Sequence, residues 1–76
     1  MKKGEAAHVH TVTVSEIVKA RAETGLSQAA FAKVLDVSVR TLQDWEQGRL
    51  RPSGAANTLI KVAARHPETI LEAISA

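Results

Sequence analysis

Cysteine is absent from the 76 residues, and so is any long apolar run. Without cysteine the chain cannot form a disulfide or a thiolate metal site, which fits a reducing cytoplasm. Met1-Lys2-Lys3 resembles the basic start of a signal peptide, but no apolar core follows it in residues 4–8. No stretch approaches the length of a membrane span. We therefore expect a cytoplasmic protein with no membrane segment.

Sets of catalytic residues are missing as well. The sequence offers no nucleophile–base set, no phosphate-binding loop and no cluster of metal ligands. His8 and His10 would share one face of an extended segment, but two ligands without a third rarely hold a metal. A helical core this small also leaves little room for a substrate pocket. We expect no enzyme activity, no cofactor and no metal.

The chain is long enough for one small domain. A domain of 76 residues buries a limited core, which a second subunit can help to complete. The formal net charge of +2 is mildly basic and does not by itself indicate nucleic-acid binding. The positions of the cations are therefore more informative than their number.

Capping residues divide the chain into five short helices, so the expected fold class is all-α. Thr13 and Glu16 have capping-box spacing at the start of the first helix, with Ser15 as a rival cap. Gly25 is typical of the residue that ends such a helix. The expected caps of the later helices are Ser27, Ser38 and Ser53, with Pro67 as the first residue of the fifth.

Apolar spacing predicts which side of each helix faces the core. Residues 1–12 are expected to lie outside the domain, which would occupy residues 13–76. Residues 8–12 alternate as a strand does, and a lone strand is unstable, so they are either disordered or paired with another chain. The expected inward residues are Val14, Ile17, Val18, Arg21 and Ala22 in the first helix, Phe31, Ala32 and Leu35 in the second, and Ala55, Leu59, Val62 and Ala63 in the fourth.

A short connection around Asp36 joins the second and third helices, and Asp tolerates the positive φ of a tight turn. Such a connection makes the helices cross steeply, as in a helix-turn-helix. On the third helix, Leu42 and Trp45 point to one side, and Arg40 and Gln43 point to the other. Arginine pairs with guanine and amides pair with adenine in the major groove. The expected base-reading residues are Val39, Arg40, Gln43 and Asp44.

Polar residues also flank this face. The free amides at the start of the second helix form an anion site, and two arginines directly follow the third helix. Phosphate contacts of this kind fix the register on DNA and make affinity depend on salt. A solvated surface is the alternative interpretation for these side chains. The expected phosphate-binding residues are Ser27, Gln28, Ser38, Thr41, Arg49 and Arg51.

A set of residues at fixed spacing carries a family resemblance: Leu26-Ser27-Gln28, Phe31-Ala32, Leu35-Asp36-Val37-Ser38, Leu42, Trp45-Glu46-Gln47-Gly48-Arg49 and Pro52. This pattern resembles the phage-repressor-like, Cro-type (XRE) helix-turn-helix family and implies its five-helix fold. The stretch 37–49, with Arg51-Pro52 and His66-Pro67-Glu68, is most similar to antitoxins of the HigA and MqsA kind. Those antitoxins bind an mRNA-cleaving toxin and repress their own operon as dimers.

The resemblance also implies roles for single residues. Gln28 matches a glutamine that contacts a phosphate, and Ala32 matches the small residue where the two helices touch. Arg21 and Glu46 match a buried ion pair, and Arg21 is also unusual as a cation on an apolar face. Asp36 replaces the glycine that is usual in the turn. The residues that match base-facing positions are Val39, Arg40 and Asp44, with Gln43 beside them.

The expected function is therefore a sequence-specific transcriptional repressor that binds a palindromic operator in double-stranded DNA as a homodimer. The alternative is a protein-interaction module whose main role is to neutralise a RelE/HigB-like toxin. An apolar stripe in the fifth helix is either the lid of the monomer core or the dimer surface. Its residues are Ile70, Leu71 and Ile74.

Overall fold

The structure, a computed structural model, describes residues 10–75. This part of the chain forms five helices and no strand, which confirms the all-α, five-helix expectation. Expectations for residues 1–9 lie outside the described residues. The helices are α2 (Val14–Thr24), α3 (Gln28–Val34), α4 (Val39–Glu46), α5 (Gly54–Arg65) and α6 (Pro67–Ser75).

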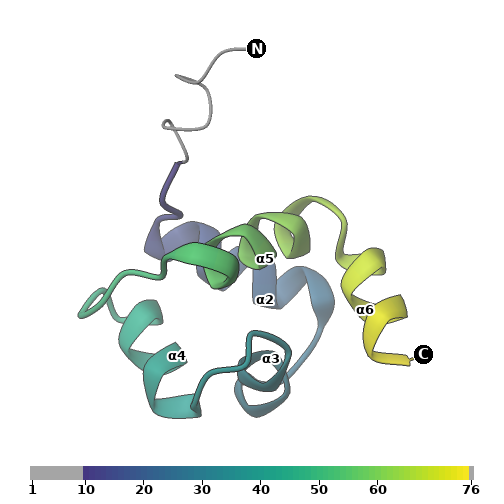
Figure 1. The fold of residues 1–76 in the computed structure, drawn as a ribbon, viewed down its shortest axis with the longest axis horizontal. Helices are drawn as coiled ribbons and strands as arrows, with labels where there is room; N and C mark the ends of the chain where they lie inside the picture. Colours follow the sequence, from purple (N-terminus) through teal and green to yellow (C-terminus); the bar gives the residue numbers. More distant parts are fainter. Residues whose placement is uncertain (1–9, 76) are drawn as a thin grey trace.

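The helices pack in two groups. α2 and α5 have the most extensive contact, and α3 and α4 lie together on one side of that pair (Figure 1). α6 packs on α5 and α2, at the end of the molecule remote from α4 (Figure 1). None of the helices described is both long enough and apolar enough to cross a bilayer.

The start of α2 confirms the predicted capping box. The hydroxyl of Thr13 accepts the backbone N–H of Glu16 at 3.2 Å, and the Glu16 carboxylate accepts the Thr13 N–H at 2.8 Å. The Thr13 amide, together with a hydrogen bond from His10, holds the pKa of Glu16 below its usual value. Gly25 then ends α2 with a φ of 73°, as predicted.

Two of the three later serine caps are confirmed. The hydroxyls of Ser27 and Ser38 each accept the backbone N–H three residues ahead. Ser53 occupies the cap position of α5, but its side chain makes no capping hydrogen bond, so the prediction that its hydroxyl caps the helix is wrong. The chain enters α5 through an extended Ser53 and a left-handed Gly54, a different path from that of the other caps. Pro67 begins α6, as expected.

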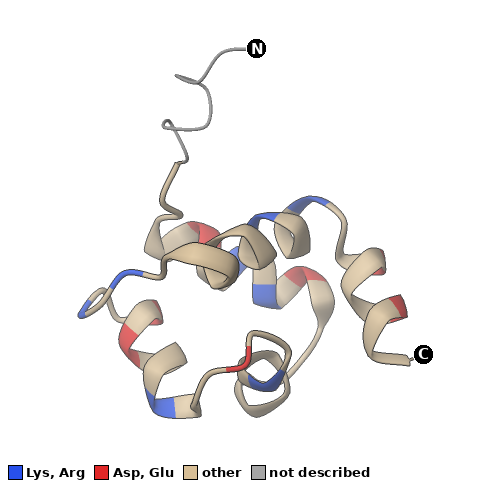
Figure 2. Cartoon of the chain, in the orientation of Figure 1, with Lys and Arg blue, Asp and Glu red and all other residues tan. Residues whose placement is uncertain are grey.

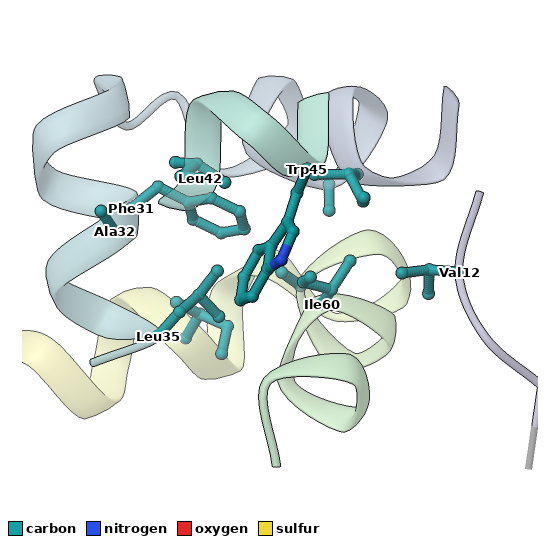
Figure 3. Packing of buried hydrophobic residues seen from close by; sticks show 11 residues of the cluster. Val12, Phe31, Ala32, Leu35, Leu42, Trp45 and Ile60 are labelled. Atoms are coloured by element: carbon teal, nitrogen blue, oxygen red, sulfur yellow. The ribbon is translucent and has the colours of Figure 1, made fainter. Parts of the chain in front are cut away.

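All five helices contribute to one hydrophobic core. The indole of Trp45 reaches into its middle, with Phe31 and Leu35 on the α3 side and Ile60 on the α5 side (Figure 3). Phe31 is fully buried, so this small domain has a well-closed centre. The buried apolar residues are Val12, Ile17, Ala20, Phe31, Ala32, Leu35, Leu42, Trp45, Ile60, Ala63 and Ile70.

The inner faces of α2 and α5 differ from the predicted ones. Both helices bury small or polar residues that hydrophobicity alone does not select, because the two backbones approach closely along their shared contact. In α2, Ile17 is buried as expected, Val14, Val18 and Ala22 were wrongly expected inside, and the residues buried in their place are Ala20 and Thr24. In α5, Ala55 is exposed, Leu59 and Val62 are half-buried, and the buried residues are Asn57, Ile60 and Ala63.

An extended segment, residues 10–13, lies against α5 and is held by Asn57. The Asn57 side chain accepts the N–H of Val12 at 2.9 Å and donates to the carbonyl of His10 at 2.8 Å. Asn57 and Val12 are both buried. Residues 10–12 are therefore held against the helices by hydrogen bonds to Asn57.

Replacing Asn57 with alanine is expected to destabilise the domain by about 1–3 kcal/mol, because the buried N–H of Val12 then loses its acceptor. Urea denaturation measures the loss, and hydrogen exchange at the Val12 amide should accelerate more than exchange in α4. Ser75→Ala, which removes an exposed hydroxyl, is the control. Unchanged exchange at Val12 would contradict the assigned role of Asn57.

Candidate nucleic-acid interface

The turn between α3 and α4 sets the crossing of the two helices. Asp36 has a φ of 59°, as predicted for this position. Its N–H donates to the carbonyl of Lys33 at 3.1 Å, and the N–H of Val37 donates to the carbonyl of Ala32 at 3.0 Å. These bonds close the last turn of α3, so α4 starts in a fixed direction only a few residues later.

α4 has one buried and one exposed side. Leu42 is fully buried and Trp45 is 6% exposed, as their predicted inward orientation requires. Val39 is 37% exposed, and the side chain of Arg40 is 82% exposed. Packing on one side therefore holds the helix while the first turn presents Val39 and Arg40 to solvent.

A polar network lies behind this exposed turn. Arg21 donates to both carboxylate oxygens of Glu46, at 2.9 and 3.3 Å. The side chain of Glu46 is only 9% exposed and that of Arg21 is 29% exposed, so the expected ion pair is present and largely screened from water. The pair joins α2 to α4.

Gln28 and Gln43 extend the network across α3 and α4. Gln28 donates its amide to Glu46 at 3.1 Å, and Gln43 donates to the amide oxygen of Gln28 at 3.4 Å. Both amides are therefore held at the junction of the two helices with one orientation. Because each amide nitrogen has two hydrogens, each keeps one N–H for an external acceptor.

Asp44 differs from the other expected base-reading residues. Its carboxylate lies 3.2 Å from Nη1 of Arg49 and 4.0 Å from Nε of Arg40, and its side chain is only 18% exposed. Basic residues accordingly lie at the start of α4 and in the loop after it, with acidic residues between them (Figure 2). The sequence pattern placed these three residues near one another, but it missed their mutual pairing. The four-residue spacing from Arg40 to Asp44 was the available signal.

Apart from Gln28, the expected phosphate-binding residues fall into two groups. The hydroxyls of Ser27 and Ser38 are engaged as caps, and Ser38 also donates to the hydroxyl of Thr41 at 3.0 Å. Arg49 and Arg51 are exposed in the loop after α4. Arg51 is in no ion pair with another of residues 10–75, so within this part of the chain its guanidinium is available to an anion.

The three dimer candidates in α6 are placed differently from one another. Ile70 is 5% exposed and belongs to the core, so its assignment to a dimer surface is wrong. Leu71 is half-buried, and Ile74 is 48% exposed. Of the two open alternatives, the core lid holds for Ile70, and only Leu71 and Ile74 remain candidates for a contact between subunits.

The helix-turn-helix family profile matches residues 17–65, well over half of the chain. The chain belongs to the XRE-type helix-turn-helix family. The matched part of this XRE-type domain includes α3, α4 and the polar network, and it leaves α6 outside. The resemblance of residues 26–52 is thereby confirmed.

Two relatives place the XRE-type domain among regulators. Antitoxin HigA-2 of Vibrio cholerae is 48% identical over 59 residues, which cover 78% of this chain and 57% of that protein. The uncharacterized HTH-type transcriptional regulator YiaG of Escherichia coli K12 is 39% identical over 57 residues, which cover 75% of this chain and 59% of that protein. The chain thus spans less than two-thirds of the length of either relative.

Proposed function

We propose that this chain is a sequence-specific DNA-binding transcriptional repressor that places α4 in the major groove. The observation that carries the proposal is the two-sided packing of α4, with Leu42 and Trp45 buried and Arg40 almost fully exposed. The major groove admits an α-helix whose outward side chains read base edges. Membership of the XRE-type family supports the same function.

Within this proposal some residues read bases and others contact the DNA backbone. Arg40 reads a guanine, Val39 contacts a thymine methyl group, and Gln43 reads a base through the N–H left over from its bond to Gln28. Backbone contacts then position the domain without reading sequence. The proposed phosphate-binding residues are Ser27, Gln28, Ser38, Thr41, Arg49 and Arg51.

The proposed assembly is a homodimer on a palindromic operator. Two copies of α4 would then enter the major groove about 34 Å apart, one helical turn of DNA. Ile74 supports this assembly because an exposed isoleucine beside the half-buried Leu71 is an apolar surface that a second subunit can cover.

A second proposed role is that of an antitoxin. The 48% identity to antitoxin HigA-2 favours it, and we propose that the chain neutralises an mRNA-cleaving toxin and represses its own operon. Co-expression with the product of any small gene adjacent to its own is the direct test. Relief of growth arrest together with co-purification would support the role, and growth arrest that persists would contradict it.

Selection from a randomised duplex pool tests the DNA-binding proposal. The full chain should enrich a palindrome whose half-sites are about one helical turn apart. Fluorescence anisotropy should then give an affinity for the enriched duplex at least 1,000-fold above that for random duplex, roughly the lower end for specific binders. A pool without enrichment, together with equal affinity for all duplexes at low salt, would refute sequence-specific repression.

A further inference from the structure

The contacts of Asp44 point away from base reading. Its carboxylate is 18% exposed, whereas the side chains of Arg40 and Arg49, on either side of it, are 82% and 63% exposed. One largely covered carboxylate thus lies between two exposed cations on the surface that α4 presents. A carboxylate turned toward its own arginines is poorly placed to accept a hydrogen bond from a cytosine amine.

The backbone fixes this arrangement. The carbonyl of Asp44 accepts the N–H of Arg49 at 2.8 Å and that of Leu50 at 3.4 Å. Gly48, with a φ of 79°, provides the reversal that brings the loop back along α4. The backbone therefore brings Arg49 alongside Asp44, where its guanidinium lies 3.2 Å from the carboxylate.

We propose that Asp44 restrains Arg40 and Arg49 and thereby suppresses binding to DNA of the wrong sequence. The inference rests on the proposed DNA binding. Non-specific affinity comes essentially from cations that contact phosphates. A guanidinium that contacts the DNA shares or gives up its contact with Asp44, and the carboxylate, brought close to the phosphate backbone, is repelled by it.

The restraint acts unequally on the two kinds of duplex. On the correct sequence, Arg40 exchanges its long 4.0 Å contact with Asp44 for two hydrogen bonds to guanine. The new hydrogen bonds offset the lost attraction between Arg40 and Asp44. On a random sequence Arg40 forms no such pair with guanine, so nothing offsets the lost attraction between Arg40 and Asp44. Asp44 is therefore a positioning residue that widens the gap between specific and non-specific affinity.

The variant Asp44→Asn tests this role because it keeps the size of the side chain and removes its charge. The three side chains then carry a net charge of +2 instead of +1. Affinity for random duplex should rise about three- to tenfold at low salt, and the slope of log K against log salt should steepen by about 1. Affinity for the selected palindrome should rise less, so that the ratio of the two affinities falls.

Glu23→Gln is the matched control. It makes the same change of charge and breaks a similar four-residue pair, with Lys19 at 3.9 Å on α2. The experiment uses fluorescence anisotropy with the full chain, the selected palindrome and a random duplex at several salt concentrations. Glu23→Gln should leave the affinity ratio within about twofold of wild type, since screening weakens charges far from the DNA.

A double mutant shows whether the effect passes through the arginine. In an Arg49→Ala background, Asp44→Asn should raise affinity for random duplex by clearly less than it does in the wild type. An equal rise in both backgrounds would contradict the proposal that Asp44 restrains Arg49. It would mean that the Asp44 carboxylate weakens binding only by repelling the DNA phosphates.

Two further results would also overturn the inference. If Asp44→Asn weakens binding to the palindrome and leaves random duplex unchanged, Asp44 reads a base. If Asp44→Asn behaves as Glu23→Gln does, the carboxylate restrains nothing. Both results require a wild-type protein that prefers the palindrome, whereas a wild type that binds no duplex refutes the proposed function itself.

Discussion

Replacing Glu46 with alanine is expected to destabilise the domain by about 2–3 kcal/mol and to lower its Tm by about 10–20 °C. The Glu46 side chain is 9% exposed and accepts hydrogen bonds from Arg21 and Gln28. Its removal leaves a guanidinium and an amide without their shared acceptor. Breaking a buried pair costs about 3–5 kcal/mol, and water reaches the 29% exposed side chain of Arg21, which reduces the loss.

Thermal and urea denaturation measure this effect. Glu46→Gln, which keeps an acceptor for Arg21 and loses the charge, should fall between wild type and Glu46→Ala. The exposed pair of Lys19 and Glu23 supplies the control, because Glu23→Ala should cost less than about 1 kcal/mol. Equal losses from the two alanine variants would mean that the pair behind α4 is no more important than an ordinary surface pair.

Arg40→Ala is expected to leave the stability of the domain almost unchanged and to weaken operator binding strongly. The side chain is 82% exposed and its only ion pair in the described chain is 4.0 Å long, so the fold does not depend on it. Loss of a two-bonded contact to guanine costs about 1–3 kcal/mol in each half-site. In a homodimer the loss occurs twice, so affinity should fall about 30-fold or more.

The pattern of the loss separates base reading from general attraction. Arg40→Ala should relax the preference at one base pair of each half-site, as measured with single-position variants of the selected palindrome. Arg49→Ala should instead weaken all sequences alike and reduce the salt slope by about 1. If Arg40→Ala leaves operator affinity unchanged, the face assigned to the groove is the wrong one.

Features with a local cause were predictable from the sequence. The capping box at Thr13, the left-handed Gly25 and the positive φ of Asp36 depend on a few neighbouring residues, and each occurs where it was expected. The two sides of α4 were predictable for the same reason, since Leu42 and Trp45 are three residues apart and much more apolar than their neighbours.

Features that depend on distant partners were missed. α2 packs on α5, α4 and α6 and buries Ala20 and Thr24, neither of which is apolar enough to stand out beside Val18. Asn57 pairs with a backbone 45 residues away, which no local pattern records. Its position three residues before Ile60, on the same helical face, was the one available sign that it is buried.

Trp45 gives the molecule a built-in optical reporter. It is the only tryptophan, the chain has no tyrosine, and its indole lies 6% exposed on the side of α4 opposite Arg40. Its emission therefore reports how firmly α4 is packed on the core, and in the proposed docking the indole lies on the side of α4 away from the duplex. A titration with DNA can thus be followed from inside the protein, without an attached dye.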